Sequence, residues 1–249
     1  MLLCLLLGGC AVPQPQDTPS PARRMVEETT GRAYWLYVPS NYTSERSWPL
    51  VITLHGASPW DSAKDQIREW KYLAERNGLI VAAPEIESAA LHIVGRAGWQ
   101  ADLLKDEKAI MAILDSLESS YSITRHPPRG KLSRPGVLLT AFLEGGYALY
   151  HIGLGHPERF GALVARDCYS DQRTLEGLEI TDDVRSLPIV IFNGKDGWGR
   201  LDTHGWRVYR YLRENRCFRA YRREVRGGQL RRPDRAYEYW LRYASSPPS

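Results

Sequence analysis

The sequence has few of the features that are typical of nucleic-acid-binding, metal-binding or membrane-spanning proteins. Its net charge of +4 over 249 residues gives little support to a nucleic-acid partner. Of its four cysteines, Cys168 and Cys217 lie beyond the N-terminal region, and neither has a C-x-x-C partner or a histidine at ligand spacing. We therefore expect no metal site and no other cofactor. The spacing does not decide whether these two cysteines form a disulfide.

Long apolar runs are also missing. Residues 1–10 are apolar but too few to span a bilayer, which takes about 20 residues. They end in Leu-Gly-Gly-Cys, which resembles a bacterial lipobox, so Cys10 would be the lipidated N-terminus of the mature protein. Because no basic stretch precedes them, a truncated ordinary signal peptide is the alternative. Residues 11–25 hold four prolines and are expected to form a tether.

These N-terminal features predict export. We expect the protein in the bacterial cell envelope, lipid-anchored in the periplasm or at the outer membrane, or else secreted. The lipid anchor is the only membrane contact that the sequence predicts, and no feature indicates an oligomeric state.

Strand and helix patterns alternate along the chain. Short apolar runs typical of buried strands occur at residues 50–54, 79–83, 137–142, 162–165 and 189–192, and further strands are expected at 34–38 and 220–225. Apolar residues at helical spacing occur at 61–77, 103–117, 203–215 and 233–243. We expect Asp61 to cap the first of these helices and Gly78 to end it. The alternation predicts one α/β domain over residues 26–245, with a mostly parallel sheet covered by helices on both faces and a short tail at 246–249.

The sequence has no serine at the position where the surrounding pattern predicts a nucleophilic serine. Residues 137–142 form an expected strand, Gly145 and Gly146 open an expected helix, and the turn between them is framed like the G-x-S-x-G nucleophile elbow of serine hydrolases. Leu143 occupies the nucleophile position, and its side chain cannot attack a carbonyl. We expect Leu143 to point into the former acyl pocket and partly fill it, and Glu144 to add negative charge at the pocket mouth.

A second motif, His55-Gly56-Ala57, follows a buried strand. In α/β-hydrolases a His-Gly pair at this place shapes the loop that supplies one backbone N–H group of the oxyanion hole, and the residue after the nucleophile supplies the other. The two donors would be the N–H groups of Ala57 and Glu144. Because they belong to the backbone, we expect the hole to survive the loss of the serine.

The acid and the base of a hydrolase triad should follow the nucleophile along the chain. Asp196 comes directly after an expected strand and is the candidate acid, although an Asx-turn before Gly197 explains this aspartate equally well. No histidine occurs after His204, and Gln229 stands where the base is expected. An amide side chain cannot accept a proton near neutral pH, so Gln229 cannot act as a general base.

With these motifs, residues 25–245 resemble the secreted polyhydroxybutyrate-depolymerase and feruloyl-esterase group of α/β-hydrolases. The matching segments are residues 34–39, 54–56, 139–146, 155–160, 193–196 and 227–237. The resemblance implies the α/β-hydrolase fold and carboxylic-ester chemistry, with serine at position 143 and histidine at position 229. This sequence departs from the family at both positions, so the resemblance implies the fold more strongly than the activity.

Other nucleophiles remain open as alternatives. Ser58 follows the oxyanion loop and Ser170 follows an expected strand, but neither has the elbow frame. A Cys168 nucleophile would need a base brought by the fold from one of four histidines: His55, His92, His151 or His204.

These features are compatible with three functions. The first is a catalytically silent esterase homologue that binds a small ester or a polysaccharide-linked ligand. The second is an active ester hydrolase, of feruloyl-esterase or polyester-depolymerase type, with an unrecognised nucleophile. The third is a non-enzymatic envelope protein that uses an arginine-rich face, since residues 200–242 contain thirteen arginines, including Arg207, Arg210 and Arg213.

Overall fold

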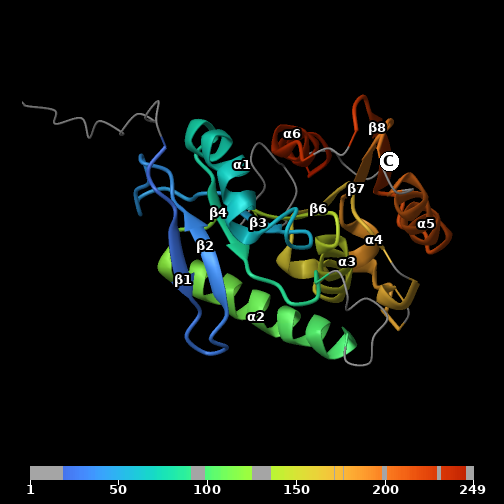
Figure 1. Ribbon diagram of the computed structural model, residues 1–249, viewed down its shortest axis with the longest axis horizontal. Coiled ribbons are helices and arrows are strands. Elements are labelled where there is room, and N and C mark those ends of the chain that lie inside the picture. The colour runs from blue at the N-terminus through green and yellow to red at the C-terminus, as the bar shows by residue number, and fades with distance from the viewer. Residues whose placement is uncertain are drawn as a thin grey trace, which may run out of the picture.

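One eight-stranded sheet organises the chain, with the strand order β1-β2-β4-β3-β5-β6-β7-β8 (Figure 1). The computed structural model describes residues 19–90, 99–124, 136–170, 172–175, 177–197, 201–228 and 231–244. β1 (Arg23–Val26), β2 (Ala33–Tyr37) and β4 (Ile80–Pro84) are joined by antiparallel pairs. The other strands pair in parallel: β3 (Leu50–Leu54), β5 (Val137–Phe142), β6 (Ala162–Arg166), β7 (Ile189–Gly194) and β8 (Ala220–Val225).

Helices cover both faces of this sheet. α1 (Ala63–Asn77) and α6 (Pro233–Ala244) pack on one face. The other face carries α2 (Trp99–Ser120), α3 (Gly145–Gly155) and α5 (Leu201–Glu214). A short helix, α4 (Asp182–Ser186), and two 3-10 turns, η1 (Pro157–Arg159) and η2 (Gln172–Thr174), lie in the connections. The predicted α/β architecture is therefore confirmed.

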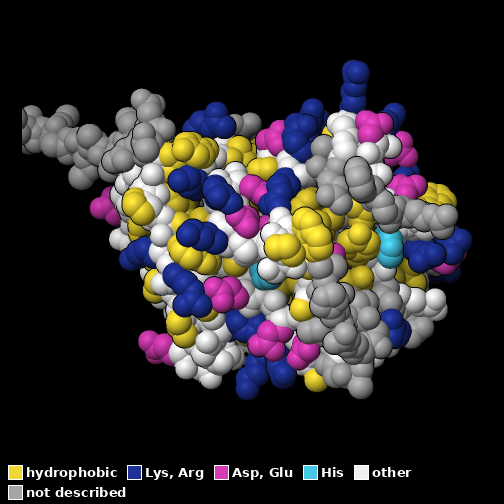
Figure 2. All heavy atoms as spheres, viewed as in Figure 1, with side chains coloured by type: hydrophobic (Ala, Val, Ile, Leu, Met, Phe, Trp, Pro, Cys, Tyr) yellow, Lys and Arg dark blue, Asp and Glu magenta, His cyan; other side chains and the backbone are white. Residues whose placement is uncertain are grey.

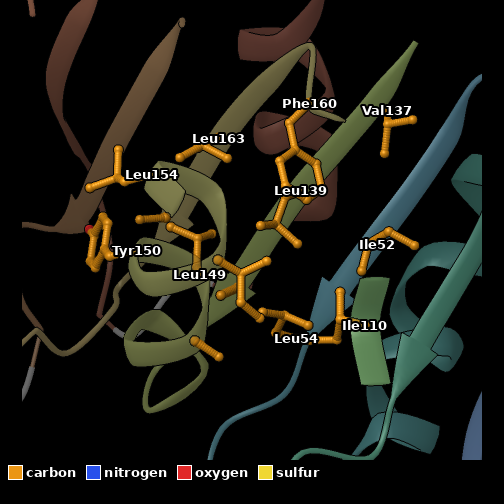
Figure 3. Packing of buried hydrophobic residues seen from close by; sticks show 14 of the residues in the cluster. Ile52, Leu54, Ile110, Val137, Leu139, Leu149, Tyr150, Leu154, Phe160 and Leu163 are labelled. Carbon is orange, nitrogen blue, oxygen red and sulfur yellow. The ribbon is translucent and has the colours of Figure 1, made fainter. Parts of the chain in front are cut away.

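The central strands are apolar throughout because helices bury both of their faces. Every residue of β3, β4, β5, β6 and β7 is buried. Successive side chains alternate between the two packed layers, so Leu139 faces α3 whereas Leu138 faces the layer of α1 and α6. Figure 3 shows the first layer, where Leu149 and Leu154 of α3 lie against Leu139 and Leu163 of the sheet.

Two local expectations differ from the structure. Ser62, not Asp61, caps α1, and its hydroxyl accepts the Asp65 N–H at 3.2 Å. Asp61 is instead buried, because its carboxylate binds the loop after β3. The sequence also did not indicate β1, whose Arg23, Arg24 and Met25 fall within the expected tether. β1 is a short, largely exposed edge strand, so it carries no apolar pattern.

The described residues bear on two further expectations. Cys168 and Cys217 are both buried and free, so the disulfide that the sequence left open is not formed between them. None of the helices within the described ranges is long and apolar enough to cross a membrane. The export segment with Cys10, most of the tether, and the tail at residues 246–249 lie outside the described residues.

Candidate active site

The turn between β5 and α3 has the shape expected of an elbow. Leu143 lies at its tip with φ of 48°, a left-handed conformation that is strained for a bulky side chain. The glycines that follow are required by close packing. A Cβ on Gly145 would lie 2.7 Å from the His55 carbonyl oxygen, and one on Gly146 would lie 2.6 Å from the Cys168 Cβ. The start of α3 is therefore pressed against the ends of the neighbouring strands.

The Leu143 side chain is buried at this tip. It is 6% exposed and packs with Phe142, Leu201 and the half-buried Tyr169. The Tyr169 N–H also donates to the Leu143 carbonyl at 2.9 Å, which ties the turn to the end of β6. Leu201 in turn lines a cavity of about 350 Å³ at the end of β7. Leu143 is therefore buried, whereas its place in a former acyl pocket stays a prediction.

Glu144 differs from the expectation in a way that changes the site. Its side chain is only 8% exposed, and its Oε2 atom accepts the Ala57 N–H at 2.8 Å. A Cβ on Gly56 would lie 3.0 Å from the same oxygen, so the carboxylate sits directly against the loop. Glu144 therefore lies inside the site rather than at its mouth, and the Ala57 N–H that was expected to stay available already binds an anion.

His55 braces the same loop. Its Nε2 atom accepts the Ile86 N–H at 3.0 Å, so the protonated Nδ1 atom donates to the Gly56 carbonyl at 2.6 Å. Because backbone groups engage both ring nitrogens, the imidazole acts here as a structural support of the loop.

A network of polar side chains, which the sequence did not indicate, holds the loop after β3 in place. The Asp61 carboxylate accepts the Gly56 N–H at 2.7 Å and also accepts from the side chains of Gln66 and Arg231. Arg231 in turn pairs with Glu69 and donates to the Trp60 carbonyl at 2.6 Å. The network thus joins the segment after β8 to the loop after β3. No sequence pattern connects Asp61 with Arg231, which are 170 residues apart.

Arg166 is the buried centre of that network. Its guanidinium donates to the Arg231 carbonyl at 2.7 Å and to the Thr53 hydroxyl at 3.0 Å. Burial lowers the pKa of Arg166 below its ordinary value, against the opposing influence of Glu69. The guanidinium carbons of Arg231 and Arg166 lie 4.8 Å and 5.9 Å from the centre of the Phe142 ring, so cations flank the residue that precedes Leu143.

Asp196 is placed at the end of β7 but is exposed. Its N–H donates to the Gly227 carbonyl at 3.0 Å, so the candidate acid lies beside the segment that leads to position 229. Gln229 itself lies outside the described residues. A second carboxylate, Asp167 at the end of β6, is buried and accepts the Gly194 N–H at 2.9 Å. Asp167 thereby fixes the end of β7.

The alternative nucleophiles gain no support from their surroundings. Burial raises the pKa of the Cys168 thiol well above its ordinary value, and the thiol donates to the Ala141 carbonyl at 3.3 Å. The Ser170 hydroxyl donates to the His204 carbonyl, while His204 Nδ1 lies 2.7 Å from the Ser170 carbonyl. The imidazole therefore binds the backbone of Ser170 rather than its hydroxyl. Ser58 is exposed on the loop after β3.

The strand order and the left-handed turn after β5 define the α/β-hydrolase fold. Solved structures of esterases share it. A ferulic acid esterase of Anaeromyces mucronatus aligns at a TM-score of 0.67 with 16% identity, over 94% of this chain and 93% of that one. An S-formylglutathione hydrolase of Staphylococcus aureus aligns at 0.63 with 14% identity, over 94% and 96%.

Sequence comparison gives a weaker match. A bifunctional acetylxylan esterase/xylanase of Neocallimastix patriciarum is 26% identical over 125 residues, which are 50% of this chain and 16% of that enzyme. No family model matches the chain. The resemblance to feruloyl-esterase-like α/β-hydrolases is thus confirmed for the fold, whereas the polyhydroxybutyrate-depolymerase part and the roles of individual residues stay predictions.

Proposed function

We propose that this protein is a catalytically silent member of the esterase-like α/β-hydrolases, lipid-anchored through Cys10 in the bacterial envelope. One observation carries the proposal: at the elbow, a buried leucine replaces the nucleophile and the next side chain occupies the Ala57 N–H. We infer that Leu143 marks the nucleophile position, Asp196 the acid position and Gln229 the base position.

The two changes at the elbow act on different parts of catalysis. Leu143 removes the atom that would attack a carbonyl carbon. The Glu144 carboxylate occupies the Ala57 N–H, which would otherwise stabilise the negative charge that develops on the substrate oxygen. Losing one such donor typically costs about 3 kcal/mol. Repairing either defect alone leaves the other in place.

The proposed ligand follows from the scaffold and its relatives. The names of the similar proteins refer to ferulic acid and to acetylxylan. We therefore propose that this chain binds a small ester or a polysaccharide-linked acyl group without cleaving it.

Reactivation tests the proposal. The unmodified protein should not hydrolyse p-nitrophenyl acetate. Leu143→Ser with Gln229→His should give slow turnover if Asp196 completes the triad, and the same variant with Asp196→Asn is the matched control. Serine-dependent turnover by the unmodified protein would overturn the proposal.

The two other functions predict different results. An active hydrolase of feruloyl-esterase or polyester-depolymerase type is favoured by Asp196 at the end of β7, and it requires turnover by the unmodified chain. A non-enzymatic binding protein of the envelope is favoured by Arg207, Arg210 and Arg213, which are exposed on α5. Charge reversal at these three residues should then abolish capture of its partner from envelope extract.

A further inference from the structure

The outer surface of α1 is basic because two of the three acids of the helix point away from it. Its exposed or half-exposed side chains include four cations, which are Lys64, Arg68, Lys71 and Arg76. We call these four residues, together with Trp35 and Tyr72, the α1 face. Figure 2 shows Lys and Arg side chains gathered among hydrophobic ones where Figure 1 places α1.

Two of the three acids of α1 have partners that keep them from neutralising this face, whereas Asp65 offsets one of its four cations. Glu69 pairs with Arg166 and Arg231 in the buried network. Glu75 is 1% exposed and accepts hydrogen bonds from the hydroxyls of Tyr37 and Ser40. Asp65 alone lies near the surface, at the helix start, where it pairs with Arg68.

The neighbouring helix α6 makes a useful contrast. Its Arg235 and Arg242 both pair with Glu238, and Asp234 is a second acid in the helix, so α6 carries as many acids as bases. Of the two helices on this side of the sheet, α1 therefore has the larger excess of cations at its surface.

Aromatic groups accompany the cations. The Lys64 Nζ atom lies 5.4 Å from the centre of the Trp35 ring, and Lys71 Nζ lies 5.2 Å from that of Tyr72. Tyr72 is 53% exposed. Cations beside half-exposed Trp and Tyr rings suit the headgroup region of a bilayer, where the rings take the interface and the cations take the phosphates.

The chain enters the domain at this face. A shallow cavity of about 210 Å³ is lined by Trp35, Lys64, Ile67, Arg68, Lys71 and Ala22, and Ala22 belongs to the first described segment of the chain. Only residues 11–18 separate Cys10 from that segment, and they span at most about 30 Å when extended. A lipid on Cys10 would therefore hold the α1 face close to the membrane surface.

We propose that the α1 face docks on anionic phospholipid headgroups and orients the tethered domain on the bilayer. The inference rests on the proposed envelope location but not on catalytic silence. Because α5 packs on the opposite face of the sheet, it would point away from the membrane.

Vesicle binding by the full chain with Cys10→Ala tests the docking without the lipid. The probes are vesicles of phosphatidylcholine alone and of phosphatidylcholine with phosphatidylglycerol, at low and high salt. We expect binding to the anionic vesicles that weakens at high salt. K64E/R68E/K71E should reduce the partition coefficient at least about 100-fold, or about 3 kcal/mol at about 1 kcal/mol for each basic residue.

The matched control is R207E/R210E/R213E on α5, which changes the net charge equally and should bind within about threefold of the parent. If the α1 reversal disturbs the circular dichroism spectrum, K64Q/K71Q replaces it, with an expected loss of at least about tenfold. Equal losses for the two faces, or no loss at α1, would overturn the proposal. Binding to an anionic polysaccharide but not to vesicles would also overturn it. Esterase activity does not enter these readouts, so the proposed silence and the proposed docking fail separately.

Discussion

Glu144 should limit catalysis even after the triad is rebuilt. In the structure its carboxylate accepts the Ala57 N–H at 2.8 Å, and this N–H is the group proposed to bind a substrate oxygen. The carboxylate and a substrate oxygen cannot both occupy this amide. Freeing one oxyanion donor is worth about 3 kcal/mol, so Glu144→Ala should raise kcat about 100-fold in the Leu143→Ser/Gln229→His background.

Two companion variants separate charge from occupancy. Glu144→Gln removes the negative charge but keeps a carbonyl able to accept the same N–H, so it should gain less activity than Glu144→Ala. Glu144→Ala alone should remain inactive because Leu143 still supplies no nucleophile. The assay is p-nitrophenyl acetate turnover with kcat and KM determined separately. If the triple variant is no faster than the double variant, although both react with a fluorophosphonate at the introduced serine, the reasoning about Glu144 is refuted.

Three further predictions concern the support of the elbow. Gly146→Ala should destabilise the protein by about 1–3 kcal/mol in urea unfolding, because the new Cβ would collide with Cys168 and Tyr169. Gly155→Ala is the neutral control, because a Cβ at this position would have no neighbouring atom within 4 Å. Asp61→Ala should cost about 1–3 kcal/mol by the same measurement, mainly because it leaves the buried Gly56 N–H without its acceptor; a loss under about 0.5 kcal/mol would contradict the role of the network. Cys168 should resist a thiol reagent in the native protein at pH 8 and react in urea. Because burial raises the pKa of this thiol in the folded protein, the free energy of unfolding should fall as pH rises above the ordinary thiol pKa.

Most of the sheet could be predicted from the sequence, because strands that are buried on both faces consist of continuous apolar runs. The bounds of β3, β5 and β8 agree with the expected ranges, and Gly78 ends α1 with φ of 65° as expected. β1 escaped prediction because an exposed edge strand needs no apolar side chains. An aspartate before a helix predicts an N-cap, but the Asp61 carboxylate binds the Gly56 N–H instead.

The interior of the site could be predicted less well. The elbow and the missing serine are local patterns, so the sequence reveals them. The contact between Glu144 and Ala57 joins residues 87 positions apart, and an acidic residue beside a pocket is expected to face water. The Asp61–Arg231 pair joins residues 170 positions apart and depends on how the loops after β3 and β8 meet. Such contacts arise from tertiary packing, which no short motif encodes.

Fluorophosphonate labelling of the unmodified protein, read by intact mass, tests most directly whether a hydrolase scaffold is kept here without its chemistry. We expect no adduct, whereas Leu143→Ser/Gln229→His/Glu144→Ala should acquire one adduct at the introduced serine. An adduct on a native serine of the unmodified protein, accompanied by ester turnover, would contradict catalytic silence.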